Sequence, residues 1–570
     1  MTDAGEPLDH PAWPERIWIL TALGAALGLA FHLLTRGAGS WGWTEDPARL
    51  AGASFVAVGG LAFAFSLERR RWPWAVAFAA TAGLVVAGVT AWNGPPENWA
   101  DDEAWHFFAS LFAVAVAVPL FQGLRDEGRL RAPAAAVHAH AWSNLILWGA
   151  ACAFVLSTFL LALLLAALFG LIGITFPETL LNRRWFDVML VAAALGAAVG
   201  ILRDRDKVLG ALQRVVRAVL SFLAPVLALG LVLFVAALPF TGLEPLWRET
   251  KATTPILLLC ILGAVFLANA AIGNGPEEEP KLRPLRWAAA ALAAVALPLA
   301  LVAGLSTGKR IAQYGYTPER LWAGVFVAVA AAAGMAYLLA LVRGRAAWPE
   351  RIRRANVRLA AGICLLAFFL ALPILSFGAL SARDQVARLR SGRIPPDKVD
   401  WAALRFDFGP AGRRALVRLA ESGPAEVRKR AQEALAAKYR YDLLPDPAAM
   451  RPASLRLAVD GNAPVPDALR LAIARDGYCT GNECRLVFET PRRAILLGFT
   501  CAGCLPFVRL YVPAPSGGWG GSEPGGAPPP PAVAVPIAVR RDGKVELRTV
   551  EKKQVFLDGK PVGPVFDPGP

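Results

Sequence analysis

The hydropathy pattern divides the chain into an apolar part and a polar part. Up to about residue 379, long blocks are apolar on every face, whereas soluble helices carry a polar stripe. A helix that spans a bilayer needs about 20 mostly apolar residues. The blocks of suitable length are 17–34, 50–67, 74–92, 104–122, 143–170, 186–202, 216–238, 254–273, 287–306, 321–342 and 357–379. We therefore predict a membrane all-α fold, a polytopic bundle of about eleven transmembrane helices over residues 17–379, after a tail of residues 1–16.

The pattern changes after the last block. A basic amphipathic helix is predicted over 380–393 as a continuation of the last span, and two Gly-Pro-Ala triplets, at 409–411 and 423–425, each open a helical stretch. We expect residues 380–440 to form a juxtamembrane helical segment with a helical hairpin over 409–440.

From residue 441 on, shorter apolar runs favour strands. These predicted strands are 454–459, 484–489, 493–499, 506–512, 533–539, 545–550 and 554–557. Glycine and proline dominate residues 513–532, which predicts a flexible loop. Residues 441–570 are therefore expected to form a small soluble α+β domain.

The distribution of basic residues predicts the orientation. With the N-terminus on one side, the loops of that side hold 21 Lys and Arg residues, and the loops of the other side hold 9. Cytoplasmic loops carry the excess of such residues. We expect a protein of the bacterial inner (plasma) membrane with a cytoplasmic N-terminus and, after eleven spans, a periplasmic C-terminal domain.

The composition narrows the class of protein. Only 18% of the residues are charged and the mean hydropathy is +0.45, which excludes a disordered chain and a disulfide-dense mini-domain. The net charge of +15 comes largely from residues that flank spans, so it does not predict binding to nucleic acid. The expected partners are the lipid bilayer and an envelope protein that contacts the C-terminal domain.

The spans hold few ionisable side chains, although such groups inside a membrane usually mark ion or substrate pathways. The polar residues that stand out are His32 near the end of the first span, Asn269 late in the eighth, and Asp187 at the entrance of the sixth. This scarcity disfavours an ion-coupled transporter.

Glycine and proline in the spans bear on packing. The runs 24–28 and 196–200 begin and end with glycine, a spacing that permits close approach of two membrane helices. We interpret the prolines inside spans as kinks packed against neighbouring helices, with broken helices that line a binding site as the alternative. These prolines are Pro225, Pro298 and Pro373.

Two outward loops, 239–253 and 306–320, stand out for their polar residues. In the second, Thr317, Pro318 and Glu319 have the types expected at the start of a helix. The charged residues around them are the best candidates for an outward-facing polar site. They are Glu244, Arg248, Lys309, Arg310 and Arg320.

The cysteines fall into two groups. Three lie inside spans and are interpreted as apolar filler: Cys152, Cys260 and Cys364. The other four lie in the tail: Cys479, Cys484, Cys501 and Cys504. An even number in an oxidising compartment indicates two disulfides, whose pairing the sequence leaves open. A four-thiolate zinc site and a redox-active pair at 501 and 504 are the alternatives. We expect no metal and no cofactor.

Several segments resemble one family. They are Pro239 to Leu243, Tyr314-Gly315, Thr317 to Leu321, Ile374 to Ser381, Ser381 to Leu389 and Asp400 to Gly409. Together they resemble a bacterial multi-pass membrane family, DUF4153, over roughly residues 140–440. The resemblance implies an inner-membrane protein, and it supplies no activity and no catalytic residues.

We expect a non-enzymatic membrane protein with a periplasmic interaction or sensing domain. One alternative is a transporter or channel for a small solute or lipid, which requires a polar cavity between the seventh, ninth and eleventh spans. Another is a membrane enzyme on a lipid-linked substrate, which requires the polar residues of the two outward loops to meet in one cleft. No catalytic residues are predicted.

Overall fold

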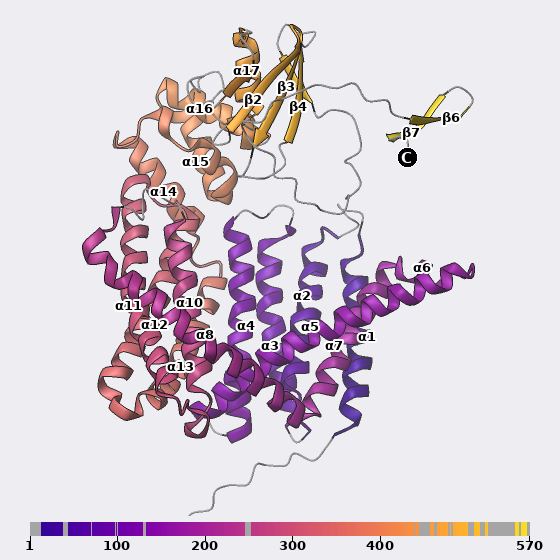
Figure 1. Cartoon of the computed structure of the whole chain (residues 1–570), viewed down its shortest axis with the longest axis vertical. Coiled ribbons are helices and arrows are strands. Elements are labelled where there is room, and N and C mark those ends of the chain that lie inside the picture. Colours follow the sequence, from indigo (N-terminus) through magenta and orange to yellow (C-terminus); the bar gives the residue numbers. More distant parts are fainter. Residues whose placement is uncertain are drawn as a thin grey trace, which may run out of the picture. The chain divides into compact units, whose positions relative to one another are not determined.

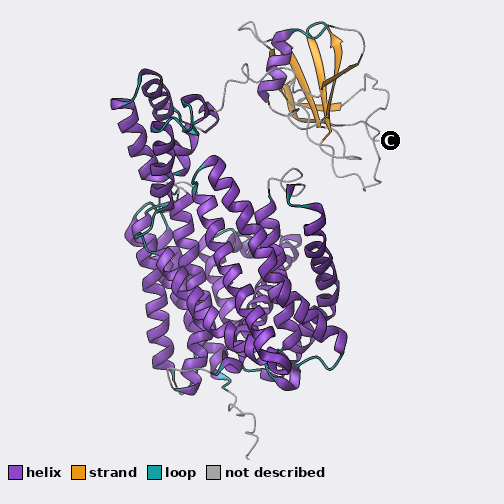
Figure 2. Cartoon of the chain, turned by 90° about the vertical axis from the view of Figure 1, so that its left-hand side faces the viewer, coloured by secondary structure: helices purple, strands orange, loops and turns teal. Residues whose placement is uncertain are grey.

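The chain folds as two units, Met1–Ala436 and Ala437–Pro570. The first is helical and the second contains the strands (Figure 2). The computed structural model describes residues 13–37, 44–69, 71–96, 99, 101–128, 133–244, 252–438, 440–443, 457–460, 464–476, 479, 483–499, 507–513, 519–522, 553–557 and 560–566.

Ten segments of the described residues are long and apolar enough to cross a membrane. Single helices make up the segments before Pro318 (Figure 1): α1 (Glu15–Thr35), α2 (Pro47–Ser66), α3 (Trp72–Asn93), α4 (Asp101–Glu127), α5 (Ala134–Leu171), α7 (Arg184–Arg203), α8 (Asp206–Thr241), α10 (Thr253–Ile272) and α11 (Arg283–Tyr314). Between α5 and α7 lies the short α6 (Phe176–Leu181).

The last segment, Pro318–Ala371, contains two helices, α12 (Pro318–Gly344) and α13 (Trp348–Ala371), joined by a 3-10 turn at Arg345–Ala347. The hydroxyl of Tyr337 donates to Asn356 Oδ1 at 2.7 Å. In one continuous helix, 19 residues would separate these positions by about 28 Å. The chain therefore reverses at the turn, and each of the predicted blocks overlaps one of the helices α1 to α5, α7, α8 and α10 to α13.

Successive long helices alternate in direction, so their connecting turns gather at two faces of the first unit. Glu68, after α2, pairs with Arg16 at the start of α1 and with Arg203 at the end of α7. Arg353, near the start of α13, donates to the Ile272 carbonyl at the end of α10. We call this end the first face and the opposite end, where α1 finishes, the second face. The predicted loops with the larger number of basic residues lie on the first face.

The helices α1 and α7 pack most closely through their glycines. A Cβ on Gly28 would lie 2.8 Å from the Val188 carbonyl oxygen, and one on Gly196 would overlap the backbone of Leu20. Only hydrogen fits between the two backbones at these positions. The close approach predicted from the runs 24–28 and 196–200 is confirmed.

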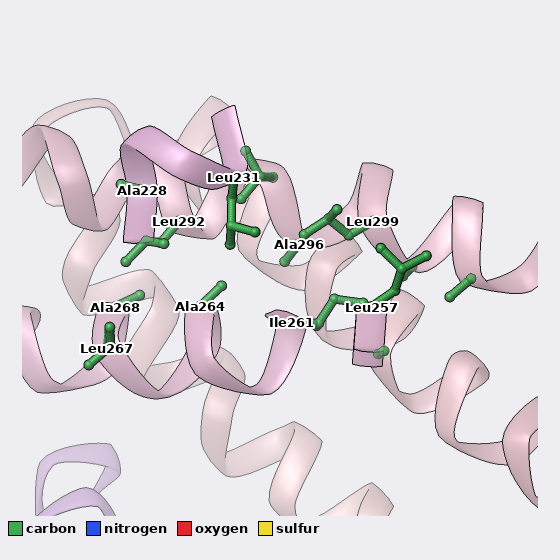
Figure 3. Packing of buried hydrophobic residues seen from close by; sticks show 14 of the residues in the cluster. Ala228, Leu231, Leu257, Ile261, Ala264, Leu267, Ala268, Leu292, Ala296 and Leu299 are labelled. Carbon is green, nitrogen blue, oxygen red and sulfur yellow. The ribbon is translucent and has the colours of Figure 1, made fainter. Parts of the chain in front are cut away.

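The largest apolar cluster lies among α8, α10, α11 and α12 (Figure 3). Its fully buried members include Ala224 on α8, Ala264 on α10, and Leu292 and Leu299 on α11. Small alanines alternate with leucines, which brings the helix backbones together and lets the larger side chains interdigitate. The space among these helices is therefore filled by apolar side chains.

Two of the three predicted span prolines lie inside helices that are not interrupted. Pro225 and Pro298 lie inside α8 and α11, which continue through them. This favours the kink interpretation over broken helices. Pro373 lies outside a helix, in the segment after α13.

The predicted continuation from the last span into the basic helix is wrong. The last span ends at Ala371, and α14 (Phe377–Arg390) begins after a break. Pro373 has no amide hydrogen to continue the α13 ladder. Ser376 caps the new helix by accepting from the Ala379 amide at 3.0 Å. Because of this break, α14 does not have to continue in the direction of α13.

Two further helices complete the first unit, α15 (Gly409–Ser422) and α16 (Ala425–Ala436), after a π-helical turn at Ala403–Asp407. They form the hairpin predicted over 409–440. A Cβ on Gly378 of α14 would lie 2.8 Å from the Phe408 carbonyl oxygen. This close approach joins α14 to the hairpin.

The second unit is built on a sheet of order β1-β2-β3-β4-β5. Its strands are β1 (Leu457–Asp460), β2 (Glu483–Thr490), β3 (Arg493–Phe499), β4 (Phe507–Pro513) and β5 (Trp519–Ser522). β1 and β2 are parallel, and α17 (Asp467–Asp476) connects them. Leu469 and Ile473 of α17 pack on Leu486 and Leu496 of the sheet, all fully buried. A separate antiparallel pair joins β6 (Lys553–Leu557) and β7 (Lys560–Phe566).

The predicted strands 454–459, 484–489, 493–499, 506–512 and 554–557 correspond to β1, β2, β3, β4 and β6. The strands predicted at 533–539 and 545–550 lie outside the described residues. Two elements differ from the expectation. The helix α17 was not predicted, and β5 lies inside the predicted loop 513–532, where Trp519 pairs with Pro513 and packs on the core.

Candidate functional site

The structure describes four of the five outward candidates. Glu244 lies three residues after the end of α8, Lys309 and Arg310 lie in the last turns of α11, and Arg320 lies in the first turn of α12. Arg248 lies outside the described residues. A single site formed by all five residues therefore stays a prediction.

Arg320 serves the turn between α11 and α12. Its Nη1 donates to the Gly315 carbonyl at 2.9 Å, and its guanidinium carbon lies 5.4 Å from the centre of the Tyr314 ring. Thr317 caps α12 by accepting from the Arg320 amide at 3.4 Å, as its position in the sequence predicted. These contacts hold the reversal of the chain in one conformation.

The helix α14 binds the same turn through its polar side chains. Gln385 Nε2 donates to the carbonyls of Tyr314 at 3.0 Å and Tyr316 at 3.2 Å. Asp384 Oδ2 accepts from the Tyr316 amide at 2.8 Å and from Arg388 Nε at 3.1 Å. The last carbonyls of a helix have no partner within it, and these bonds satisfy them from outside. We call this contact between α14 and the 311–316 segment the clasp.

Gly315 is the tightest point of the clasp. Its φ of +79° lies in the left-handed region, which a residue with a side chain adopts at a cost. A Cβ there would lie 2.5 Å from Asp384 Oδ2 and 2.7 Å from Gln385 Nε2. Glycine is therefore required both by the turn and by the proximity of α14.

The other end of α14 is also held. Asp102, at the start of α4, accepts from the Phe377 amide at 3.1 Å and is buried. A carboxylate at this position stabilises the free amides and the positive end of the helix dipole. The clasp and Asp102 together fix both ends of α14 on the second face of the bundle.

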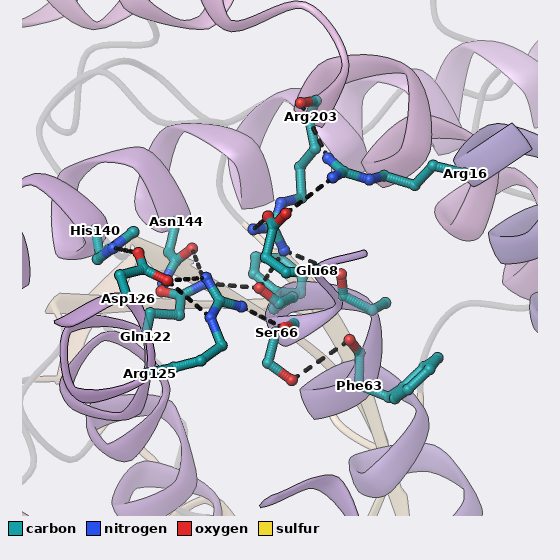
Figure 4. A network of polar contacts seen from close by, with 12 residues as sticks. Arg16, Phe63, Ser66, Glu68, Gln122, Arg125, Asp126, His140, Asn144 and Arg203 are labelled. Atoms are coloured by element: carbon teal, nitrogen blue, oxygen red, sulfur yellow. Dashed lines mark hydrogen bonds and ion pairs between the residues drawn. The ribbon is translucent and has the colours of Figure 1, made fainter. Parts of the chain in front are cut away.

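The first face holds a network of ionic and polar groups, in which the arginines are buried and the carboxylates are more exposed (Figure 4). Glu68 accepts from Arg16 Nη2 at 3.2 Å and from Arg203 Nη2 at 3.0 Å. The two arginine side chains are 9% and 12% exposed, so each depends on this carboxylate for neutralisation. Arg203 also donates to the Phe65 carbonyl at the end of α2.

A second branch of the network surrounds the same helix end. Gln122 donates to the Phe65 carbonyl at 2.6 Å, and Arg125 donates to the Ser66 carbonyl. Asp126 accepts from Arg125 Nε at 2.8 Å and lies 2.7 Å from His140 Nε2. These contacts supply partners and positive charge to the last carbonyls of α2, where the helix dipole is negative.

A ring of three amide and hydroxyl side chains lies between α10, α12 and α13. Asn269 Nδ2 donates to the Tyr337 hydroxyl at 2.6 Å, that hydroxyl donates to Asn356 Oδ1 at 2.7 Å, and Asn356 Nδ2 donates to Asn269 Oδ1 at 2.6 Å. The ring closes on itself, so each of these groups has a partner inside the protein. The role that Asn269 takes here is structural.

The sequence analysis singled out Asn269 but not the first-face network. Glu68, Arg125 and Asp126 flank spans, where charged residues are ordinary. The available signal was that the loop after α2 is short and carries a carboxylate among basic residues. Among the described residues, no group of three or more His, Cys, Asp or Glu side chains is placed to hold a metal ion. The arrangement joins helix ends.

In the second unit, Cys479 and Cys484 form a disulfide with a Cα to Cα distance of 5.8 Å. This agrees with the disulfide interpretation for one pair of the four tail cysteines. Cys501 and Cys504 lie outside the described residues. The cysteines interpreted as filler, Cys152, Cys260 and Cys364, are free.

Comparison with known proteins gives one match. The model of a family described as a domain of unknown function (DUF4153) matches residues 55–419. No curated protein and no solved structure matches the chain. The matched range covers more than half of the chain and includes both sides of the clasp.

Proposed function

The chain belongs to the DUF4153 family, and from this premise we propose that it is a non-enzymatic protein of the bacterial inner membrane. In this proposal the helical bundle anchors the second unit in the periplasm, where that unit binds an envelope protein or senses a condition of the envelope. The family is a multi-pass membrane family without an assigned activity, so the proposal rests on the arrangement of this chain.

The orientation in the proposal follows from charge. The loops of the first face hold 21 basic residues, against 9 in the loops of the second face. The positive-inside rule assigns the first face to the cytoplasm. Because α13 runs from the first face to the second, the chain after Ala371 belongs on the outer side. The disulfide between Cys479 and Cys484 supports the same assignment, since disulfides persist in oxidising compartments.

The main structural support for the proposal is the clasp. Asp384, Gln385 and Arg388 of α14 bond groups of their own helix and of the 311–316 segment. The result is a rigid support from which the chain continues into the second unit. Such a support suits a protein that presents a domain to its surroundings.

The alternative functions find less support. A transporter with a path between α8, α11 and α13 requires a polar cavity there, yet apolar side chains fill the space around α8, α10 and α11. An enzyme on a lipid-linked substrate requires available cations at the second face, yet Arg320 bonds the Gly315 carbonyl. Neither alternative accounts for the clasp.

A pair of reporter fusions tests the proposal. Alkaline phosphatase and green fluorescent protein are each fused after Ala436. The phosphatase is active only when exported, and the fluorescent protein matures in the cytoplasm. We expect an active phosphatase and no fluorescence.

Fusions after Ala346, in the turn of the first face, serve as the matched control and are expected to give the reverse pattern. Fluorescence after Ala436 together with an inactive phosphatase would refute the proposed presentation of the second unit in the periplasm. Identical patterns at the two positions would place both on the same side of the membrane and would refute the crossing of the membrane by α13.

A further inference from the structure

A cleft of about 400 Å³ lies among α1, α2 and α7. Its volume is within the range of about 300–1,000 Å³ found for ligand sites. The lining is apolar apart from one carboxylate and includes four glycines. The glycine positions are Gly24, Gly28, Gly60 and Gly196. Because the three helices are membrane spans, the space between them faces hydrocarbon, and an acyl chain matches its chemistry.

The cleft has about the depth of one leaflet. Along α1 it extends from Phe31, near the second face, to Leu20, and eleven residues of helix rise about 16 Å. The hydrocarbon core of a bilayer is about 30 Å thick. A lipid of the leaflet at the second face therefore has a tail of suitable length.

The end of the cleft at the second face is polar. Asp187, in the first turn of α7, lines the cleft, and its Oδ1 is buried without a hydrogen-bond partner. His32 lies one turn beyond Gly28, and its Nδ1 is likewise buried without a partner. Gly28 lies against Val188 and Met189, so the antiparallel helices bring His32 to the level of the α7 N-terminus. An unpartnered carboxylate oxygen of Asp187 thus lies at one end of the apolar cleft, and the unpartnered His32 Nδ1 lies just beyond the lining.

We propose that this cleft binds a phospholipid with a primary ammonium headgroup, from the leaflet at the second face. The ammonium donates to Asp187 Oδ1, and one acyl chain fills the cleft down to Leu20. The phosphate lies beyond the lining of the cleft, where His32 Nδ1 donates to it and the positive charges of Arg36 and Arg184, the charged neighbours of His32, balance it. A buried carboxylate oxygen without a donor costs free energy, and the ammonium supplies the missing donor. Asp187 also favours the start of α7 through the helix dipole, but that role does not require a buried oxygen.

Native mass spectrometry tests the proposal on the full-length chain. The protein is released from nanodiscs that contain equal amounts of phosphatidylethanolamine, phosphatidylcholine and phosphatidylglycerol. The ethanolamine lipid carries N–H donors, the choline lipid carries the charge without donors, and the glycerol lipid has no amine. We expect the ethanolamine lipid to be retained about tenfold more than either of the others, as a charged hydrogen bond implies.

Three variants separate the contribution of the headgroup contact from that of the cleft for the acyl chain. Asp187→Asn is expected to abolish the headgroup preference and to keep some bound lipid. Ala57→Trp, which fills the cleft, is expected to remove bound lipid of every class. Glu45→Gln makes the same change of charge at an exposed position before α2 and is expected to behave as the wild type.

Equal retention of the three lipids by the wild type would overturn the proposal and leave a tail site without headgroup selection. A preference that survives Asp187→Asn would also overturn it. A lipid-free dimer would show that a second copy of the chain covers the cleft instead. None of these outcomes depends on which side of the membrane the second face occupies, so the lipid test and the orientation test fail independently.

Discussion

Replacing Gly315 by alanine is expected to release α14 from the bundle. The backbone conformation of Gly315, with φ +79° and ψ −175°, costs an alanine about 1–3 kcal/mol. The new Cβ would lie 2.5 Å from Asp384 Oδ2 and 2.7 Å from Gln385 Nε2. The helix must move to relieve this overlap, which breaks at least one hydrogen bond of a charged group, at about 1.5–3 kcal/mol. The total cost is about 3–6 kcal/mol.

Gly242, which follows α8, supplies a matched control at the second face. Its φ of +70° and ψ of −175° match those of Gly315, and a Cβ there meets no atom within 4 Å. Gly242→Ala therefore carries the backbone cost alone, and the difference of about 1.5–3 kcal/mol isolates the clasp. Where amides exchange through local opening, this difference accelerates exchange about 10- to 150-fold. The measurement is hydrogen exchange of residues 377–390 in nanodiscs, followed by mass spectrometry. Equal exchange rates in the two variants would refute the reasoning.

Three further predictions concern stability in detergent or nanodiscs. Glu68→Gln leaves two buried arginines without their carboxylate and is expected to cost about 3 kcal/mol. Its control, Glu350→Gln, breaks an exposed ion pair and should cost less than about 1 kcal/mol. Thermal melting compares the two variants, and equal shifts of the melting temperature would contradict the role of the network. Tyr337→Phe opens the polar ring and is expected to cost about 1 kcal/mol by the same assay, and an unchanged melting temperature would contradict its role. Cys479→Ser removes a disulfide that closes a short loop and is expected to destabilise the second unit by about 2 kcal/mol; denaturant unfolding followed on that unit checks this, and an unchanged midpoint would contradict it.

The sequence predicted the spans well because a bilayer imposes a strict rule. Each helix that crosses it must be long and apolar, and the residue types report this directly. The turn at Arg345–Ala347 was also predictable, since basic residues separate two apolar blocks. The end of the last span was placed too late because apolar residues continue through Leu372 to Phe377, although Pro373 and Ser376 break the helix there.

Contacts between distant segments were less accessible. The glycine runs of α1 and α7 predicted a close approach but not that the two runs face each other. The clasp joins Tyr314 to residues about 70 positions later, and no local pattern reports that distance. Both segments nevertheless belong to the motifs that resemble the DUF4153 family. The structure gives a physical reason for these motifs, because Gly315, Asp384 and Gln385 fit against one another.

In the second unit, the strands were visible from alternation, whereas α17 was missed. Its sequence, Asp467 to Asp476, is short and has alternating charges, so its apolar face is only Leu469, Ala472 and Ile473. That face becomes a helix signal only when a sheet is present to receive it. In the sequence, the polar residues of the first-face network likewise look like ordinary loop charges. Their contacts form only when the fold brings the helix ends together.

The central claim is that the chain after the last span lies on the opposite side of the membrane from the basic loops. It is tested most directly in the full-length protein by labelling Ser391→Cys and Ala346→Cys in intact spheroplasts with a membrane-impermeant maleimide, with the labelled peptides identified by mass. Both positions are exposed in the structure. The account predicts labelling at 391 and none at 346 until the membrane is permeabilised. Labelling at 346 with protection at 391 would contradict it.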